Sequence, residues 1–215
     1  MKSLKITLLV AIMALSTALS AQVRVACVGN SITFGSGIEN REQNSYPAQL
    51  QELLGDGYDV RNFGVSGATL LSKGNKPYIE TLAYRPSLEF EPNIVLIKLG
   101  TNDSKPFNMV YIDEFIADYQ SLVDSYKALA SKPRIILVTP VKCYLSDEKP
   151  INDKRMRESI TPAINKIAKD NGLEVINGYG LCGTTLDLEI MPDILHPSAK
   201  GAAMMAQYFK EFITK

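Results

Sequence analysis

Five short apolar runs recur along the chain, and segments with helical spacing separate them. The runs cover residues 23–29, 58–63, 93–99, 134–139 and 173–177. Within the third run, Ile94-Val-Leu-Ile97 is apolar without interruption, which is typical of a parallel strand buried on both faces of its sheet. The alternation of strands and helices predicts a doubly wound α/β fold built on a parallel sheet.

Apolar residues at helical spacing predict the connecting helices. The clear segments are 46–54, 111–130, 156–170 and 198–213, and a weaker one lies within 78–84. Gly55 and Gly172 follow two of these segments, as expected of residues that end helices. Pro162 should break or kink its helix unless the helix begins there, since proline is tolerated in a first turn.

The start of the chain differs from the rest. Lys2 and Lys5 precede a short apolar block at 6–15, and small residues follow it. This pattern predicts a secretory signal peptide over residues 1–21 and one domain over residues 22–215, which implies a secreted or periplasmic protein. The alternative, a membrane-spanning helix, needs about 20 apolar residues. No cysteine lies at the junction to indicate a lipid anchor.

Composition excludes several classes of protein. The chain has 215 residues, of which 46% are hydrophobic and 21% charged, as in an ordinary globular domain. Loss of residues 1–21 removes two lysines and no acidic residue, leaving 21 basic and 23 acidic side chains and a net charge of −2. That balance is not typical of a nucleic-acid-binding protein.

The cysteines and the histidine give little reason to expect a bound group. Cys27, Cys143 and Cys182 are too few for a disulfide scaffold, and the sequence leaves open whether Cys143 and Cys182 pair. One histidine and scattered cysteines form no metal-ligand cluster. A flavodoxin-like cofactor binder is also disfavoured, because residues 29–35 lack the spread of glycines and hydroxyls that a phosphate site needs. We therefore expect no metal and no cofactor.

Residues suited to catalysis follow the predicted strands. Gly29-Asn30-Ser31 follows the first strand, Gly64 the second, and Gly100-Thr-Asn102-Asp103 the third, while Asp193-Ile-Leu-His196 precedes the last helix. Because open α/β sheets bind ligands at the carboxyl ends of their strands, we expect these groups to share one site.

Ser31 is the candidate nucleophile, and His196, as the only histidine, is the candidate base. Pro197 keeps His196 out of helical geometry. Asp193 can accept a hydrogen bond from one imidazole nitrogen, so that the other nitrogen deprotonates the serine. The alternatives are that Ser31 or Thr33 caps the helix after the first strand and that Asp193 caps the last helix.

Four blocks resemble those of the SGNH (GDSL-type) hydrolase family, in the family's order across residues 23–201. The nucleophile block is Gly29-Asn30-Ser31-Ile32-Thr33, the glycine block runs from Asn62 to Gly67, the asparagine block is Gly100-Thr-Asn102-Asp103, and the last block is Asp193-Ile-Leu-His196. This resemblance implies a flavodoxin-like three-layer α/β/α sandwich with a five-stranded parallel sheet, and a serine esterase mechanism.

The resemblance also implies a role for each matching residue. Ser31 is the nucleophile, His196 the general base and then acid, and Asp193 the group that orients His196. The oxyanion hole consists of the backbone N–H groups of Ser31 and Gly64 and the side-chain amide of Asn102. Gly64 is expected to be glycine because a side chain could block the acyl oxygen.

Two positions qualify these roles. Asn30 stands where the family usually has aspartate, and we expect altered local hydrogen bonding there but retained catalysis. Asp187 competes with Asp193 as the triad acid, but it lies further from His196 in the sequence and matches no motif.

Family membership leaves the substrate open. Export argues against acyl-CoA, and no segment is long enough for a large lid. Two polar inserts, 66–92 and 142–153, fall at the active edge and carry basic and tyrosine side chains suited to a sugar, although each could equally be solvated surface. These side chains are Lys73, Lys76, Tyr78, Tyr84, Arg85 and Tyr144.

We therefore predict an esterase that removes short acyl groups, acetyl above all, from carbohydrate. Its partner is a small-molecule or glycan ester, with no nucleic acid and no membrane segment after signal cleavage. The alternatives are a lipid acylhydrolase and a non-catalytic glycan-binding protein on the same fold. The sequence leaves the oligomeric state open.

Overall fold

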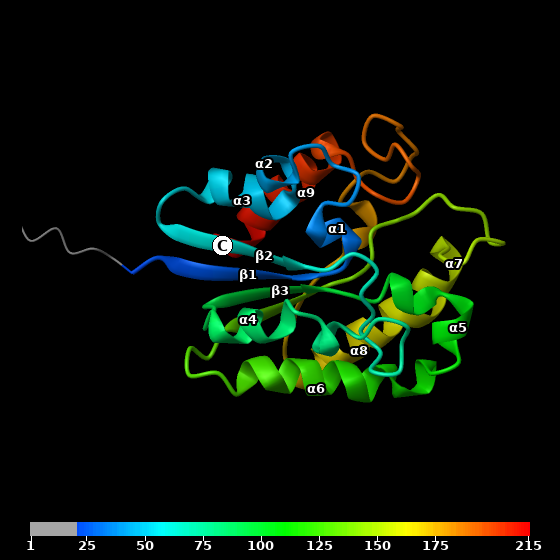
Figure 1. Ribbon diagram of the computed structural model, residues 1–215, viewed down its shortest axis with the longest axis horizontal. Helices are drawn as coiled ribbons and strands as arrows, with labels where there is room; N and C mark the ends of the chain where they lie inside the picture. Colours follow the sequence, from blue (N-terminus) through cyan, green and yellow to red (C-terminus); the bar gives the residue numbers. More distant parts are fainter. Residues whose placement is uncertain (1–20) are drawn as a thin grey trace, which may run out of the picture.

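The computed structural model describes residues 21–215, so the predicted signal peptide lies outside the described residues except for Ala21. One parallel sheet runs through the molecule in the order β2-β1-β3-β4-β5 (Figure 1). Its strands are β1 (Val23–Gly29), β2 (Tyr58–Gly64), β3 (Ile94–Lys98), β4 (Arg134–Val138) and β5 (Glu174–Ile176). All five predicted strands are confirmed, each to within one residue at either end.

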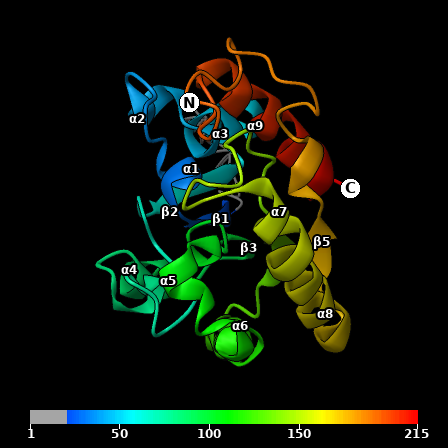
Figure 2. The same ribbon diagram turned by 90° about the vertical axis from the view of Figure 1, so that its right-hand side faces the viewer.

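Helices cover both faces of the sheet (Figure 2). On one face lie α1 (Ser31–Phe34), α2 (Arg41–Asn44), α3 (Tyr46–Leu54) and α9 (Ala199–Ile213). On the other lie α4 (Tyr84–Glu89), α6 (Phe115–Lys127) and α8 (Thr161–Asn171). The predicted flavodoxin-like α/β/α sandwich is confirmed, and its strand order is that of flavodoxin-like folds.

Short helical turns complete the connections. They are η1 (Tyr78–Glu80), η2 (Asn102–Ser104), α5 (Pro106–Met109), η3 (Ile112–Glu114), α7 (Asp153–Arg155), the π-helical turn η4 (Met156–Ile160) and η5 (Gly178–Gly180). Pro162 lies in the first turn of α8, directly after the wide π turn. The helix predicted over 156–170 is therefore divided, because proline is accepted where a new helix begins but not within one.

The weaker helix predicted within 78–84 is wrong in its position. A 3₁₀ turn occupies Tyr78–Glu80, and the α-helix begins only at Tyr84. With this late start Pro86 falls in the first turn, where its missing N–H breaks no helical hydrogen bond.

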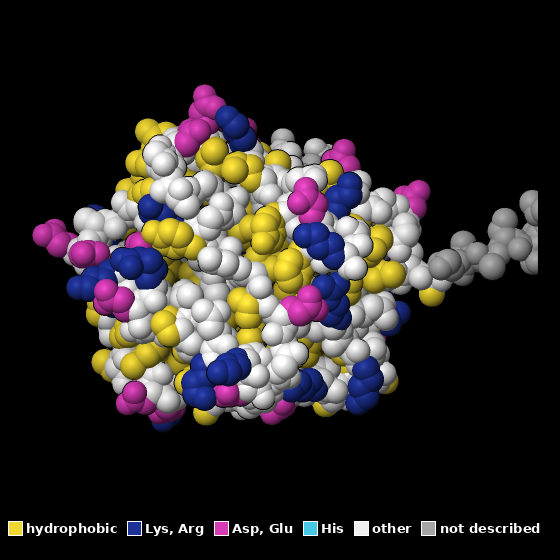
Figure 3. Space-filling model, turned by 180° about the vertical axis from the view of Figure 1, so that it is seen from behind, with side chains coloured by type: hydrophobic (Ala, Val, Ile, Leu, Met, Phe, Trp, Pro, Cys, Tyr) yellow, Lys and Arg dark blue, Asp and Glu magenta, His cyan; other side chains and the backbone are white. Residues whose placement is uncertain are grey.

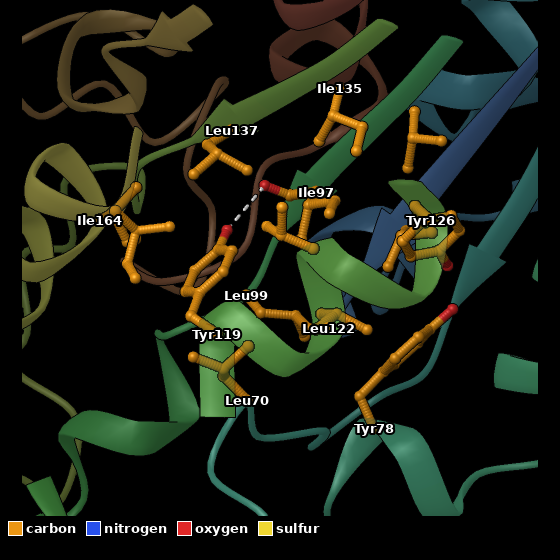
Figure 4. Close-up of a cluster of buried hydrophobic side chains, with 14 of the residues drawn as sticks. Leu70, Tyr78, Ile97, Leu99, Tyr119, Leu122, Tyr126, Ile135, Leu137 and Ile164 are labelled. Atoms are coloured by element: carbon orange, nitrogen blue, oxygen red, sulfur yellow. Dashed lines mark hydrogen bonds between the residues drawn. The ribbon is translucent and has the colours of Figure 1, made fainter. Parts of the chain in front are cut away.

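Buried tyrosines fill the core on the α6 side of the sheet (Figure 4). The Tyr119 hydroxyl donates to the carbonyl of Ile97 at 3.4 Å, and the Tyr126 hydroxyl lies 2.6 Å from Ser87 Oγ. Tyr78 donates to the Phe63 carbonyl at 2.9 Å. Since buried hydroxyls need such partners, these tyrosines serve packing. Tyr78 fits neither alternative that the sequence left open, a sugar-facing side chain or a solvated one.

The three cysteines lie in the interior of the protein. Cys27, Cys143 and Cys182 are all buried and free, so the open question of a Cys143–Cys182 pair is answered in the negative. Basic and acidic side chains are interspersed on the face shown in Figure 3, rather than gathered by sign. None of the helices within residues 21–215 is long and apolar enough to cross a membrane.

Candidate active site

Ser31 is the first residue of α1, directly after β1 delivers the chain to the carboxyl edge of the sheet. Asn30 caps this helix: its side-chain oxygen accepts the N–H of Ile32 at 3.2 Å. The alternative in which Ser31 or Thr33 caps the helix is therefore wrong. Thr33 instead bonds the Tyr46 hydroxyl at 3.1 Å. The Ser31 hydroxyl takes no part in the cap.

Three side chains form a hydrogen-bonded series at this edge. His196 Nε2 lies 3.0 Å from Ser31 Oγ, and His196 Nδ1 lies 2.6 Å from Asp193 Oδ2. Asp193 does not cap α9, because Ser198 Oγ accepts the Gly201 N–H at 3.3 Å and performs that role. The fold thus brings together a hydroxyl, an imidazole and a carboxylate in the arrangement that activates a serine.

The environment of Asp193 keeps its carboxyl group ionised. Burial alone would raise the pKa of Asp193, but the backbone N–H of His196, its ring and the N–H of Leu195 outweigh burial, and the pKa falls below its ordinary value. An ionised carboxylate beside Nδ1 favours the tautomer with the proton on that nitrogen. Nε2 then has a free lone pair facing Ser31.

An unusual backbone conformation turns the chain between the acid and the base. Ile194 has φ +60°, in the left-handed region that β-branched residues rarely adopt. Its carbonyl accepts the backbone N–H of Tyr144 at 2.8 Å, and its own N–H donates to the Met191 carbonyl at 3.0 Å. The loop after β4 therefore holds the Asp193–His196 turn in place, a support that no sequence motif signals.

The surroundings of Asn102, the predicted oxyanion donor, leave part of its side-chain amide unused. It is buried at the start of η2, just after β3, and one N–H of its side chain donates to the Ala68 carbonyl at 3.0 Å. A side-chain amide has two N–H groups, so the second remains to serve a substrate. The backbone N–H of Ser31 is also suited to this role, since the first N–H groups of a helix have no acceptor within it.

Gly64 differs from what the sequence led us to expect. Its N–H donates to Asn62 Oδ1 at 2.9 Å and would have to give up this bond to serve an oxyanion. A Cβ at position 64 would lie 2.2 Å from the backbone nitrogen of Phe34, so glycine is needed there to let α1 pass, whatever room an acyl oxygen requires. Gly67, next to the Ala68 carbonyl that Asn102 binds, offers a second N–H on the same loop.

Most of the basic and tyrosine side chains considered for sugar binding contact other residues of the protein. Lys73 pairs with Glu114 at 2.7 Å, Lys76 donates to the Ser66 carbonyl at 2.9 Å, and Tyr84 packs edge-on against Tyr78. Of the other side chains in this set, Arg85 is exposed and Tyr144 is half-buried.

Asp187, the alternative triad acid, forms a local hydrogen bond instead: its Oδ1 accepts the N–H of Glu189 at 2.8 Å.

Within residues 21–215 no group of three or more histidine, cysteine, aspartate or glutamate side chains is placed to hold a metal ion.

Comparison with known protein families shows to which family the chain belongs. Residues 27–204 match the GDSL-like Lipase/Acylhydrolase family, a match that covers most of the chain and includes all four blocks. The chain belongs to this family. The SGNH (GDSL-type) hydrolase family predicted from the sequence is thereby confirmed.

One relative with a known name is similar to this chain over most of the chain's length. An acetylxylan esterase of Xylanibacter ruminicola is 42% identical over 202 residues. The match covers 86% of this chain but only 42% of that protein, so the chain spans less than half of the relative's length. The resemblance therefore concerns one part of a longer enzyme.

Solved structures of the family share the fold. A carbohydrate acetylesterase family member from Sinorhizobium meliloti superposes with a TM-score of 0.68 at 18% identity, over 88% of this chain and 96% of that one. A two-domain esterase active on acetylated mannans gives a TM-score of 0.62 at 25% identity, over 90% of this chain and 48% of that one.

Proposed function

We propose that this chain is a serine esterase that removes acetyl groups from carbohydrate through an acyl-enzyme on Ser31. The hydrogen-bonded series from Ser31 through His196 to Asp193 carries this proposal. The acetylxylan esterase and the esterase active on acetylated mannans support the substrate class, since both act on acetylated polysaccharides by name. Export, as predicted from residues 1–21, would bring the enzyme to such polymers.

In the first half-reaction, Ser31 Oγ attacks the acetyl carbonyl while His196 Nε2 takes the hydroxyl proton. The Ser31 N–H and the free N–H of Asn102 stabilise the oxyanion, with a loop N–H at Gly64 or Gly67 as the third donor. His196 then gives its proton to the departing sugar oxygen, and the acetyl group stays on Ser31. In the second half-reaction, water gives a proton to His196 as it attacks the ester carbonyl, and His196 returns that proton to Ser31 Oγ as acetate leaves.

A direct test compares the wild type with Ser31→Ala on p-nitrophenyl acetate and on acetylated xylan. Loss of the nucleophile should lower kcat by at least about 1,000-fold on both substrates. Ser36→Ala is a matched control, because Ser36 is a half-buried serine five residues along whose side chain bonds only Ser66 Oγ in the described structure. Equal activity of Ser31→Ala and the wild type would disprove the proposal.

One observation favours lipid esters as the second candidate. The exposed apolar side chains Phe107 and Val110 lie on and just after α5, close in sequence to Asn102. A series of p-nitrophenyl esters separates the two functions. Activity should fall as the acyl chain lengthens beyond acetyl, and a rise with chain length would favour the lipid acylhydrolase.

A further inference from the structure

The loop after β2 is held by side chains from the turn that carries Asn102. Asn102 binds this loop at the Ala68 carbonyl, and Asp103, the next residue, binds it at two further points. Asp103 Oδ1 accepts the Leu71 N–H at 2.8 Å, and Asp103 Oδ2 accepts the Leu70 N–H at 3.1 Å. Two neighbouring side chains therefore hold three loop residues, and both carboxylate oxygens are used.

Burial of the Asp103 carboxylate costs free energy. It is fully buried at the end of the sheet, and burial raises its pKa to about 6 although the Leu70 and Leu71 N–H groups oppose the rise. The charged and titratable groups around it are Asp118, Lys105 and Tyr119. A buried carboxylate is unfavourable unless it is hydrogen-bonded, and here the hydrogen bonds go to the loop that faces the site.

We propose that Asp103 is a positioning residue for ester hydrolysis: its carboxylate fixes residues 68–71 against Asn102, so that the free N–H of Asn102 stays aimed at the oxyanion. This inference rests on the proposed function. Asp103 acts through Asn102 and touches no substrate. If the Leu70 and Leu71 N–H groups lost their acceptor, the loop would shift, and the Ala68 carbonyl would no longer hold the Asn102 amide in one orientation.

The loop offers a matched control. Asp118, on α6, binds the same loop one residue further on, where its two oxygens accept the N–H of Ser72 at 2.7 Å and the Ser72 hydroxyl at 3.1 Å. Asp118→Asn and Asp103→Asn therefore make the same chemical change to a carboxylate that holds the same loop. Only Asp103 is next to Asn102 and binds beside Ala68.

The experiment measures kcat and KM on p-nitrophenyl acetate for both variants, alone and combined with Asn102→Ala. An amide at position 103 presents one N–H₂ to a backbone N–H, so one hydrogen bond is lost. We expect Asp103→Asn to lower kcat by about ten-fold or more with KM within about two-fold, and Asp118→Asn to lower kcat by less than about three-fold. In the Asn102→Ala background Asp103→Asn should add less than about two-fold, because its effect passes through Asn102.

Two results would overturn the proposal. One is an equal loss of kcat in Asp103→Asn and Asp118→Asn, which indicates general support of the loop. The other is an undiminished effect of Asp103→Asn when Asn102 is absent. If Asp103→Asn does not fold, Asp103→Glu, which keeps the charge and moves the carboxylate by one methylene, is judged by the same comparisons. Activity that survives Ser31→Ala would instead disprove the proposed function, so the two failures are distinguishable.

Discussion

At the scale of single residues, the carboxylate of Asp193 is hydrogen-bonded to the His196 ring. One of its oxygens bonds the imidazole and the other accepts the Leu195 N–H at 3.0 Å. These N–H donors hold the pKa of Asp193 below its ordinary value, so the carboxylate keeps its charge at mildly acidic pH. Its stabilising contribution is complete above the pKa of an unfolded aspartate and is lost only as the pH falls through the lowered folded value.

Asp193→Asn should lower kcat by about 1,000- to 10,000-fold, because an amide can donate to Nδ1 and favour the tautomer that leaves Nε2 protonated. Steady-state kinetics on p-nitrophenyl acetate measure this loss, and unfolding by urea checks that the fold is kept. Asp187→Asn is the control, since Asp187 binds only the local N–H of Glu189 in the described structure. A larger loss in Asp187→Asn than in Asp193→Asn would reassign the triad acid.

The sequence indicated which residues meet at the site but not how Asn30 and Gly64 behave. Motif order predicted that Ser31, Asp193 and His196 lie together, as their hydrogen bonds show, because the carboxyl ends of parallel strands share an edge. The role of Asn102 stays a prediction. The Gly64 N–H is taken by Asn62, two residues away, and the backbone of Phe34 comes close only in three dimensions. Such contacts depend on the path of the chain and leave no periodic signal in the sequence.

At the scale of elements, the passage of α1 over the end of β2 fixes the position of Ser31, the proposed nucleophile. Gly29 and Gly64 lie opposite each other in the register of β1 and β2, and α1 begins two residues after Gly29. Without a side chain at 64, the backbone of α1 comes close enough that the Asn62 side chain donates to the Thr33 carbonyl at 2.8 Å. Ser31 is therefore held by close backbone packing as well as by the Asn30 cap.

Gly64→Ala should destabilise the protein by about 1–3 kcal/mol, because its Cβ must displace backbone rather than a flexible side chain. Urea denaturation measures the change, and kcat should fall with it as α1 moves. Gly180→Ala is the matched control, because a Cβ there meets no atom within 4 Å in the described structure. Equal stability of the two variants would contradict this account of the β2–α1 contact.

Element boundaries were predictable where periodicity and glycine agreed. The α3 helix runs over Tyr46–Leu54 as predicted, since apolar spacing and Gly55 both mark it. Around Pro86 and Pro162 the sequence was compatible with more than one first residue for the helix, and tertiary packing determines which one is used. The support that Tyr144 gives to Ile194 joins two loops 50 residues apart in sequence, which no local pattern encodes.

At the scale of the whole molecule, one buried cation weakens the folded state. Lys98 ends β3, is almost completely buried, and its Nζ has no hydrogen-bond partner within residues 21–215. Burial lowers the pKa of Lys98 from 10.5 to about 8. The unfolded chain therefore binds more protons than the folded one between these values, so stability rises with pH across that window and the cost is complete below about pH 8.

Lys98→Met should stabilise the protein by up to about 3 kcal/mol at pH 7, the value of the pKa shift at about 1.4 kcal/mol per unit. The gain should shrink as the pH rises above about 8 and approach zero only near about pH 11, above the pKa of 10.5 of the unfolded lysine, where the wild-type side chain is neutral in both states. Urea denaturation of both proteins at the two pH values measures it. A gain that does not depend on pH, or a loss of stability at pH 7, would show that Lys98 is not buried as an unpaired cation.

The central claim, that Ser31 is the nucleophile of an esterase assembled from the four blocks, is tested most directly by covalent labelling. The wild type and Ser31→Ala are treated with an alkyl fluorophosphonate, and peptide mass spectrometry locates the adduct while acetate release from acetylated xylan is followed. We expect one adduct, on Ser31, that grows in step with the loss of activity, and neither adduct nor activity in Ser31→Ala. An adduct on another residue, or acetate release that survives Ser31→Ala, would contradict the claim.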